Sequence, residues 1–128
     1  MNPLTREWVD KAEGDFAPAA RELRARKSPN YDAACFHAQQ CAEKFLKAIL
    51  HDAGKPFPKT HDLVMLLERV VRLDASWELL RTDMEDLTTY AVAARYPGWA
   101  AERRIARRAL AAARMVRERA RLCLGLRA

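Results

Sequence analysis

Apolar residues recur at three- and four-residue intervals along most of this chain of 128 residues. Since an α-helix turns by about 100° per residue, that spacing gathers them on one side of a helix. The pattern predicts a first helix capped by Thr5 and a short helix capped by Thr60. It predicts three further helices over about residues 31–52, 75–96 and 99–124. Ala, Leu, Arg and Glu dominate and there are only four glycines, so the composition also favours an all-α fold.

Proline and glycine mark where these helices bend or end. Pro18 lies inside the first helix, and because proline lacks a backbone N–H and clashes with the preceding turn, we expect a kink there. Ser28 or Asn30 can cap the helix that follows, and Gly54 suits its C-terminal end. Short connections favour antiparallel neighbours. We therefore predict an up-and-down bundle of four to five helices that forms a single domain over residues 1–128.

The helix predicted over residues 31–52 has two sides of different chemistry. Its apolar side, which should face the core, holds Ala34, Ala38, Cys41, Phe45, Ala48 and Ile49. A polar stripe holds His37, Gln40, Lys44, Lys47 and His51, with Phe36 and Glu43 at its edge. Two ammonium groups, two imidazoles and an amide can hold a phosphate or a nucleotide. The alternative is a solvated helix face on which the lysines offset the negative end of the helix dipole.

Arg95 lies at the end of the apolar stripe of the helix predicted over residues 75–96. A guanidinium in that position needs a carboxylate, phosphate or carbonyl partner. Glu43 is a candidate partner if the two helices pack together. A structural ion pair and a ligand clamp both fit this position.

The positive charge of the chain is concentrated near its C-terminus. There are 23 Lys and Arg against 17 Asp and Glu, but residues 95–128 hold ten arginines and only two glutamates. On the helix predicted over residues 99–124, one side carries Arg103, Arg107, Arg114, Arg117 and Arg121. Such a side can bind RNA or DNA phosphates or an acidic protein. No aromatic residues for base stacking alternate with these arginines, and a solvated face fits the pattern equally well.

Several functional classes lack support in the sequence. Cys35, Cys41 and Cys123 are odd in number and show no CxxC spacing, so we interpret them as reduced core residues. There is no metal-ligand pattern, Walker loop, GxGxxG motif or Ser-His-Asp order, and we predict no metal, cofactor or catalytic residue. No run of 18 apolar residues and no secretory signal is present, which predicts a cytoplasmic protein without a membrane association.

Three ordered motifs resemble signatures of the HEPN domain family. They are the helix over residues 31–50, the tetrapeptide Thr60-His61-Asp62-Leu63, and the tetrapeptide Ala94-Arg95-Tyr96-Pro97. A leading motif of Trp8, Ala12, Glu13 and Asp15 extends the match over nearly the whole chain. The resemblance implies a helical bundle, commonly a homodimer, usually prokaryotic and often encoded beside a minimal nucleotidyltransferase. Such pairs act as toxin–antitoxin modules, or the helical partner serves as a substrate- or nucleotide-binding subunit.

Members of the family that cleave RNA carry an arginine followed four to six residues later by a histidine, and no histidine of this chain has such an arginine. The resemblance therefore favours a noncatalytic subunit that binds a nucleotide or another phosphate-bearing ligand, or that docks a nucleotidyltransferase. The predicted ligand-binding residues are Phe36, His37, Gln40, Glu43, Lys44, Lys47, His61, Arg95 and Tyr96. Two alternatives stay open: an RNA-cleaving toxin in which Arg95 acts with His61 or His37, and a purely structural dimerisation module.

Overall fold

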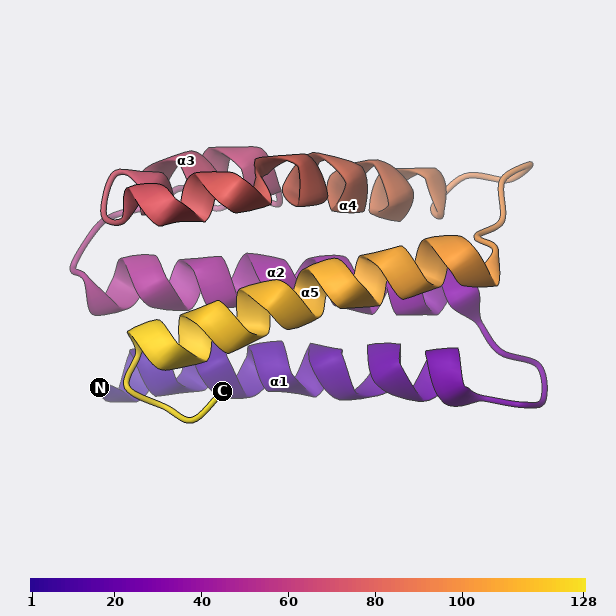
Figure 1. The fold of residues 1–128 in the computed structure, drawn as a ribbon, viewed down its shortest axis with the longest axis horizontal. Helices are drawn as coiled ribbons and strands as arrows, with labels where there is room; N and C mark the ends of the chain where they lie inside the picture. The colour runs from indigo at the N-terminus through magenta and orange to yellow at the C-terminus, as the bar shows by residue number, and fades with distance from the viewer.

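The computed structural model describes residues 1–128 and contains helices without any β-strand. Five α-helices and one 3-10 helix follow one another along the chain: α1 (Pro3–Arg24), α2 (Tyr31–Asp52), α3 (Leu63–Val71), η1 (Ala75–Leu80), α4 (Arg81–Ala93) and α5 (Arg103–Cys123). They lie roughly side by side in one bundle, with α3, η1 and α4 along one edge and α1 along the other (Figure 1). The prediction of an all-α helical bundle is confirmed.

Helix α2 is the centre of the bundle, because it packs against all four of the other α-helices. The six residues predicted to form its apolar side are all buried. Burial extends further round the helix, however, to Gln39, Glu43 and Lys47. Because most of the surface of α2 is covered, its buried polar side chains must find partners inside the protein.

The start of α1 differs from the prediction. Asn2, not Thr5, is the N-cap: its Oδ1 accepts a hydrogen bond from the Thr5 N–H at 2.9 Å, and Pro3 occupies the first helical position. Thr5 is buried instead, with its Oγ1 at 2.7 Å from Nδ1 of His51. The helix also continues through Pro18 without interruption, where we expected a kink (Figure 1). The carbonyl that Pro18 leaves without a donor belongs to Gly14, which is exposed to water.

Three other helix ends also shift. Asp62 rather than Thr60 caps α3, because Asp62 Oδ1 accepts the Met65 N–H at 3.1 Å. The helix expected over residues 75–96 divides into η1 and α4 and ends at Ala93. The last helix begins at Arg103 rather than at residue 99, since Asp32 Oδ1 binds the Ala101 N–H at 2.7 Å and holds the preceding segment against α2.

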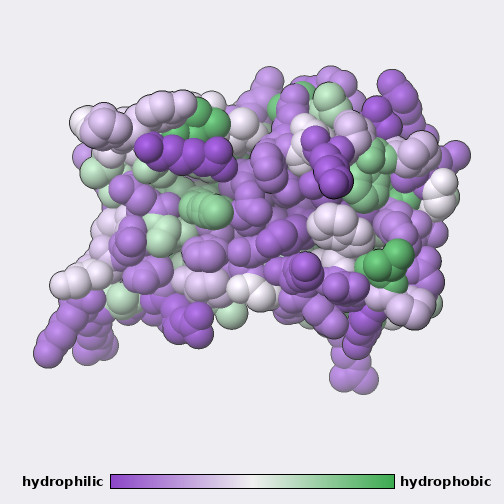
Figure 2. Space-filling view, turned by 180° about the vertical axis from the view of Figure 1, so that it is seen from behind, coloured by the Kyte–Doolittle hydropathy of each residue, from purple (hydrophilic) through white to green (hydrophobic).

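Cys35 and Cys41 are buried as predicted, but Cys123 is exposed because it is the last residue of α5, at the edge of the bundle. The face shown in Figure 2 is mainly hydrophilic, with its hydrophobic residues in small separate areas. No helix combines the length and the apolar character that crossing a membrane requires.

Candidate functional site

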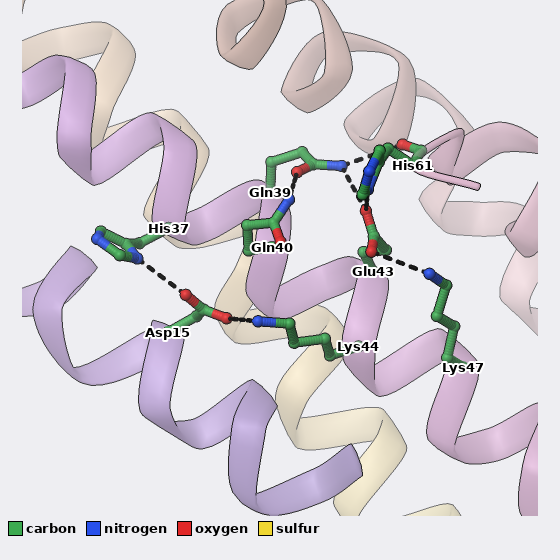
Figure 3. A network of polar contacts seen from close by, with 8 residues as sticks. All are labelled: Asp15, His37, Gln39, Gln40, Glu43, Lys44, Lys47 and His61. Carbon is green, nitrogen blue, oxygen red and sulfur yellow. Dashed lines mark hydrogen bonds and ion pairs between the residues drawn. The ribbon is translucent and has the colours of Figure 1, made fainter. Parts of the chain in front are cut away.

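Apart from His51, which contacts Thr5 of α1, the predicted polar stripe of α2 separates into two clusters, each built around one carboxylate (Figure 3). In the first cluster, Asp15 of α1 lies between two side chains of α2. Its Oδ1 is 2.8 Å from Nδ1 of His37, and its Oδ2 is 2.5 Å from Nζ of Lys44. Asp15 is buried, and its carboxylate holds both side chains at the α1–α2 interface.

The second cluster surrounds Glu43, whose side chain is only 3% exposed. Its Oε2 accepts a hydrogen bond from Lys47 Nζ at 3.0 Å, and its Oε1 lies 2.8 Å from Nδ1 of His61. Gln39 Nε2 donates to the same Oε1 at 3.3 Å and to the His61 carbonyl at 3.1 Å. Gln40 Nε2 donates to Gln39 Oε1 at 2.8 Å. The cluster thus joins α2 to the connection that precedes α3.

Aromatic rings enclose the ammonium group of Lys47. Its Nζ lies 5.4 Å from the centre of the Trp8 ring and 6.0 Å from that of Phe57. The two rings meet edge to face with their centres 6.0 Å apart. Cation–π contacts and the Glu43 carboxylate together replace the water that this buried charge loses.

Both clusters follow one plan, in which a carboxylate binds one lysine and the Nδ1 of one histidine. A carboxylate oxygen accepts, so Nδ1 carries the proton and Nε2 of each ring is left for other partners. The side chain of His61 is 72% exposed and that of His37 is 35% exposed. Both lysines are already paired, and the imidazoles of His37 and His61 are the more accessible groups of the two clusters.

A second group of predicted residues lies at the surface, and we call it the Phe36 patch: Phe36, His37, Arg95 and Tyr96. Cζ of Arg95 lies 6.0 Å from the centre of the Phe36 ring, and the ring of His37 meets Phe36 edge to face at 5.3 Å. Phe36 is 38% exposed and Tyr96 is 65% exposed. The Glu43–Arg95 ion pair suggested by the sequence does not form, because Glu43 pairs with Lys47 and His61.

The predicted basic side of α5 is reduced by internal pairing. Arg117 binds Glu13 of α1 through two hydrogen bonds, Nε to Oε1 at 2.6 Å and Nη2 to Oε2 at 3.0 Å. Arg121 Nη1 lies 3.4 Å from the same carboxylate. Hydrogen bonding to Glu13 raises the pKa of Arg117 above its ordinary value. Two of the five arginines therefore hold α5 against α1 instead of facing solvent.

Sequence reasoning missed three residues of this network: Glu13, Asp15 and Gln39. Glu13 and Asp15 belong to the leading motif, so the sequence carried a signal for them. Their partners could not be assigned, because helical periodicity gives no rotation of α1 relative to α2 and α5. Gln39 falls outside the polar stripe and was found only through its hydrogen bonds.

The geometry limits the chemistry of the site. No group of three His, Cys, Asp or Glu side chains is arranged to hold a metal ion. None of the five surface clefts is lined by any of the nine predicted ligand-binding residues. The accessible chemistry consists of aromatic contact, a free guanidinium and two imidazoles with a carboxylate behind each.

Comparison with known proteins gives one match. The comparisons with curated proteins and with solved structures found no match. The family model of the HEPN domain matches residues 5–123, which include all five α-helices except the first two residues of α1. The three ordered motifs, the helical bundle and this match agree. The chain therefore belongs to the HEPN domain family.

Proposed function

We propose that this protein is a noncatalytic HEPN subunit that docks a minimal nucleotidyltransferase through the Phe36 patch. The observation that carries the proposal is the exposed Phe36 ring with the Arg95 guanidinium against it. Aromatic residues and arginine are enriched at protein interfaces and account for much of their binding energy. An exposed Tyr96 beside Arg95 in the chain extends this composition.

The two carboxylate clusters support docking over direct binding of a phosphate. Lys44 and Lys47 are each held by a carboxylate, and the Lys47 side chain is 7% exposed. A phosphate would have to displace Asp15 or Glu43 to reach them. In the proposal, these lysines and Gln40 position α1, α2 and the α3 connection, and a nucleotide is recognised by the partner enzyme.

In this proposal, the chain and the nucleotidyltransferase form a two-component system. A toxin–antitoxin pair is one example of such a system. A homodimer, which the family commonly forms, would present two copies of the Phe36 patch and so two docking positions. The absence of the Arg–His ribonuclease spacing supports a noncatalytic role.

Co-expression tests this proposal. The chain, carrying an affinity tag, is produced together with the proteins encoded on either side of its gene. A stable complex with a nucleotidyltransferase that survives gel filtration is the expected result. Flanking genes that encode no nucleotidyltransferase, or a nucleotidyltransferase that elutes separately, would contradict the proposed partner.

One observation favours a second candidate function, cleavage of RNA. His37 and Arg95 both contact the Phe36 ring, and Asp15 orients the imidazole of His37. An oriented imidazole can transfer a proton while a guanidinium binds the phosphate. Cleavage of a labelled RNA by the wild type, lost in both His37→Ala and Arg95→Ala, would support this candidate. Equal cleavage by all three proteins would indicate a contaminating nuclease.

A further inference from the structure

A cleft at one end of the bundle is lined by cationic side chains and by no acidic ones. It has a volume of about 680 Å³ and is lined by Leu23, Arg24, Ala25, Arg26, Pro29, Tyr31 and Arg103. These residues come from the C-terminal end of α1, from the connection to α2 with the first residue of α2, and from the first position of α5. The three segments meet at the same end of the molecule (Figure 1). The cleft shares no residue with the Phe36 patch.

The three arginines of the cleft have no anionic partner within the protein. Arg24, Arg26 and Arg103 take part in none of the ion pairs of the structure. Of the carboxylates nearest in sequence, Glu102 beside Arg103 forms no ion pair, and Glu22 and Asp32 are engaged elsewhere. Glu22 Oε1 accepts the Asn30 N–H at 3.1 Å, and Asp32 Oδ1 accepts the Ala101 N–H. Three exposed guanidinium groups thus line one cleft without an ion-pair partner.

Arg103 lies at the N-terminal end of α5, where the helix dipole disfavours a positive charge. The N-terminal end of a helix carries partial positive charge and favours acidic side chains. The first turn of α5 contains Arg103 and Arg104 and no acidic residue, and the N-cap residue Glu102 makes no capping hydrogen bond. The backbone N–H groups at this end are therefore left for water or a ligand. By contrast, Arg24 lies in the last turn of α1, where the helix dipole favours a cation.

A bound anion would pair with these arginines and accept hydrogen bonds from the free N–H groups at the start of α5. Guanidinium groups match the oxygens of a phosphate in pairs, and free N–H groups at a helix start add to the same preference. Because the arginines come from three segments and line one cleft, they suit a compact group of high charge better than an extended acidic peptide. We propose that this cleft binds a phosphate-bearing anion, at a site separate from the docking surface.

Calorimetric titration with inorganic pyrophosphate and with inorganic phosphate at low salt tests the site. The wild type should bind pyrophosphate more tightly than phosphate, and Arg26→Gln and Arg103→Gln should each weaken pyrophosphate binding by about tenfold. Arg107→Gln is the matched control, because Arg107 is exposed on the same helix and lines no cleft. Its affinity should stay within about twofold of the wild type.

Other outcomes would overturn the inference. They are no heat with either anion at millimolar concentration, an equal loss in Arg107→Gln, or tighter binding of a polyglutamate peptide than of pyrophosphate. Thermal melting supplies a second readout: in anion-free buffer, Arg103→Gln should melt at or above the wild-type temperature, since it removes an uncompensated charge. A lower melting temperature would show that Arg103 is structural. Docking of the nucleotidyltransferase should persist in Arg103→Gln, which separates this test from that of the proposed function.

Discussion

Glu43 and Lys47 form a buried ion pair one helical turn apart on α2, with Oε2 and Nζ separated by 3.0 Å. Both belong to the motif by which the sequence resembles HEPN domains, and both were predicted to bind a ligand. Their partners within the protein are the His61 imidazole and the rings of Trp8 and Phe57. The pair thus connects α1, α2 and the segment before α3.

Removal of one member of this pair should destabilise the fold. Lys47→Ala leaves the Glu43 carboxylate buried without its main counter-charge, so we expect the free energy of unfolding to fall by about 3 kcal/mol. Lys44→Ala should cost less, because the Lys44 side chain is 23% exposed and water can replace it. Urea unfolding monitored by circular dichroism measures both.

The double variant Glu43→Gln, Lys47→Met serves as the control for this pair. It removes both charges, so its loss in the free energy of unfolding should be smaller than the sum of the losses of Glu43→Gln alone and Lys47→Met alone. Additive losses would mean that the two side chains do not interact, and would contradict the pairing described for α2.

The Glu13–Arg117 contact should hold α5 to α1. Arg117→Ala is expected to lower the free energy of unfolding by about 1–2 kcal/mol, because two charge-assisted hydrogen bonds are lost at a partly buried site. Arg107→Ala, at an exposed position of the same helix, should change it by less than about 0.5 kcal/mol. Chemical denaturation compares the two, and equal effects would exclude a specific role for Arg117.

The three thiols should differ in reactivity. Burial, with a smaller contribution from Asp32, raises the pKa of Cys35 to about 11, and burial also raises the pKa of Cys41. Cys123 is exposed. Since the thiolate is the reactive form, iodoacetamide at pH 8 should label only Cys123 in the folded protein and all three in urea. Mass spectrometry of the labelled protein counts the sites, and rapid labelling of Cys41 in the folded state would contradict its burial.

The same shift makes stability depend on alkaline pH. The pKa of Cys35 is raised in the folded state, whereas that of an unfolded cysteine is near 9.0. The unfolded state therefore loses this proton at lower pH than the folded state does. As a result, the free energy of unfolding falls as pH rises from about 9.0 toward the folded-state pKa. Between pH 8 and pH 11 the wild type should lose about 2 kcal/mol more than Cys35→Ala. Parallel pH profiles of the two proteins would show that Cys35 does not titrate differently on folding.

The sequence predicted most of the fold because local signals there agree with one another. The bounds of α2 follow from Asn30, whose side chain accepts the Ala33 N–H, and from Gly54, which adopts a φ of 69° just after the helix. The buried face of α2 follows from its periodicity. The cap at Thr5 was wrong because Asn2 followed by Pro3 is a stronger helix start three residues earlier.

The site was predicted less well, for a physical reason. Periodicity shows that His37, Lys44 and Lys47 share one side of α2, but it does not show that α1 covers part of that side. Asp15 and Glu43 therefore pair with the cationic side chains of the predicted polar stripe and form two clusters with them. The exposed positions of Arg95 and Tyr96 follow from α4 ending at Ala93, which no local signal marked.

Docking through the Phe36 patch is the central claim, and the affinity of the purified chain for the neighbouring nucleotidyltransferase tests it most directly. Calorimetric titration should show that Arg95→Ala weakens binding by at least about tenfold, since an arginine against an exposed aromatic ring is typical of an interface centre. Leu79→Ala is the control, because Leu79 is 79% exposed on η1 and lies outside the patch. Its affinity should equal that of the wild type. Wild-type affinity in Arg95→Ala would contradict the account.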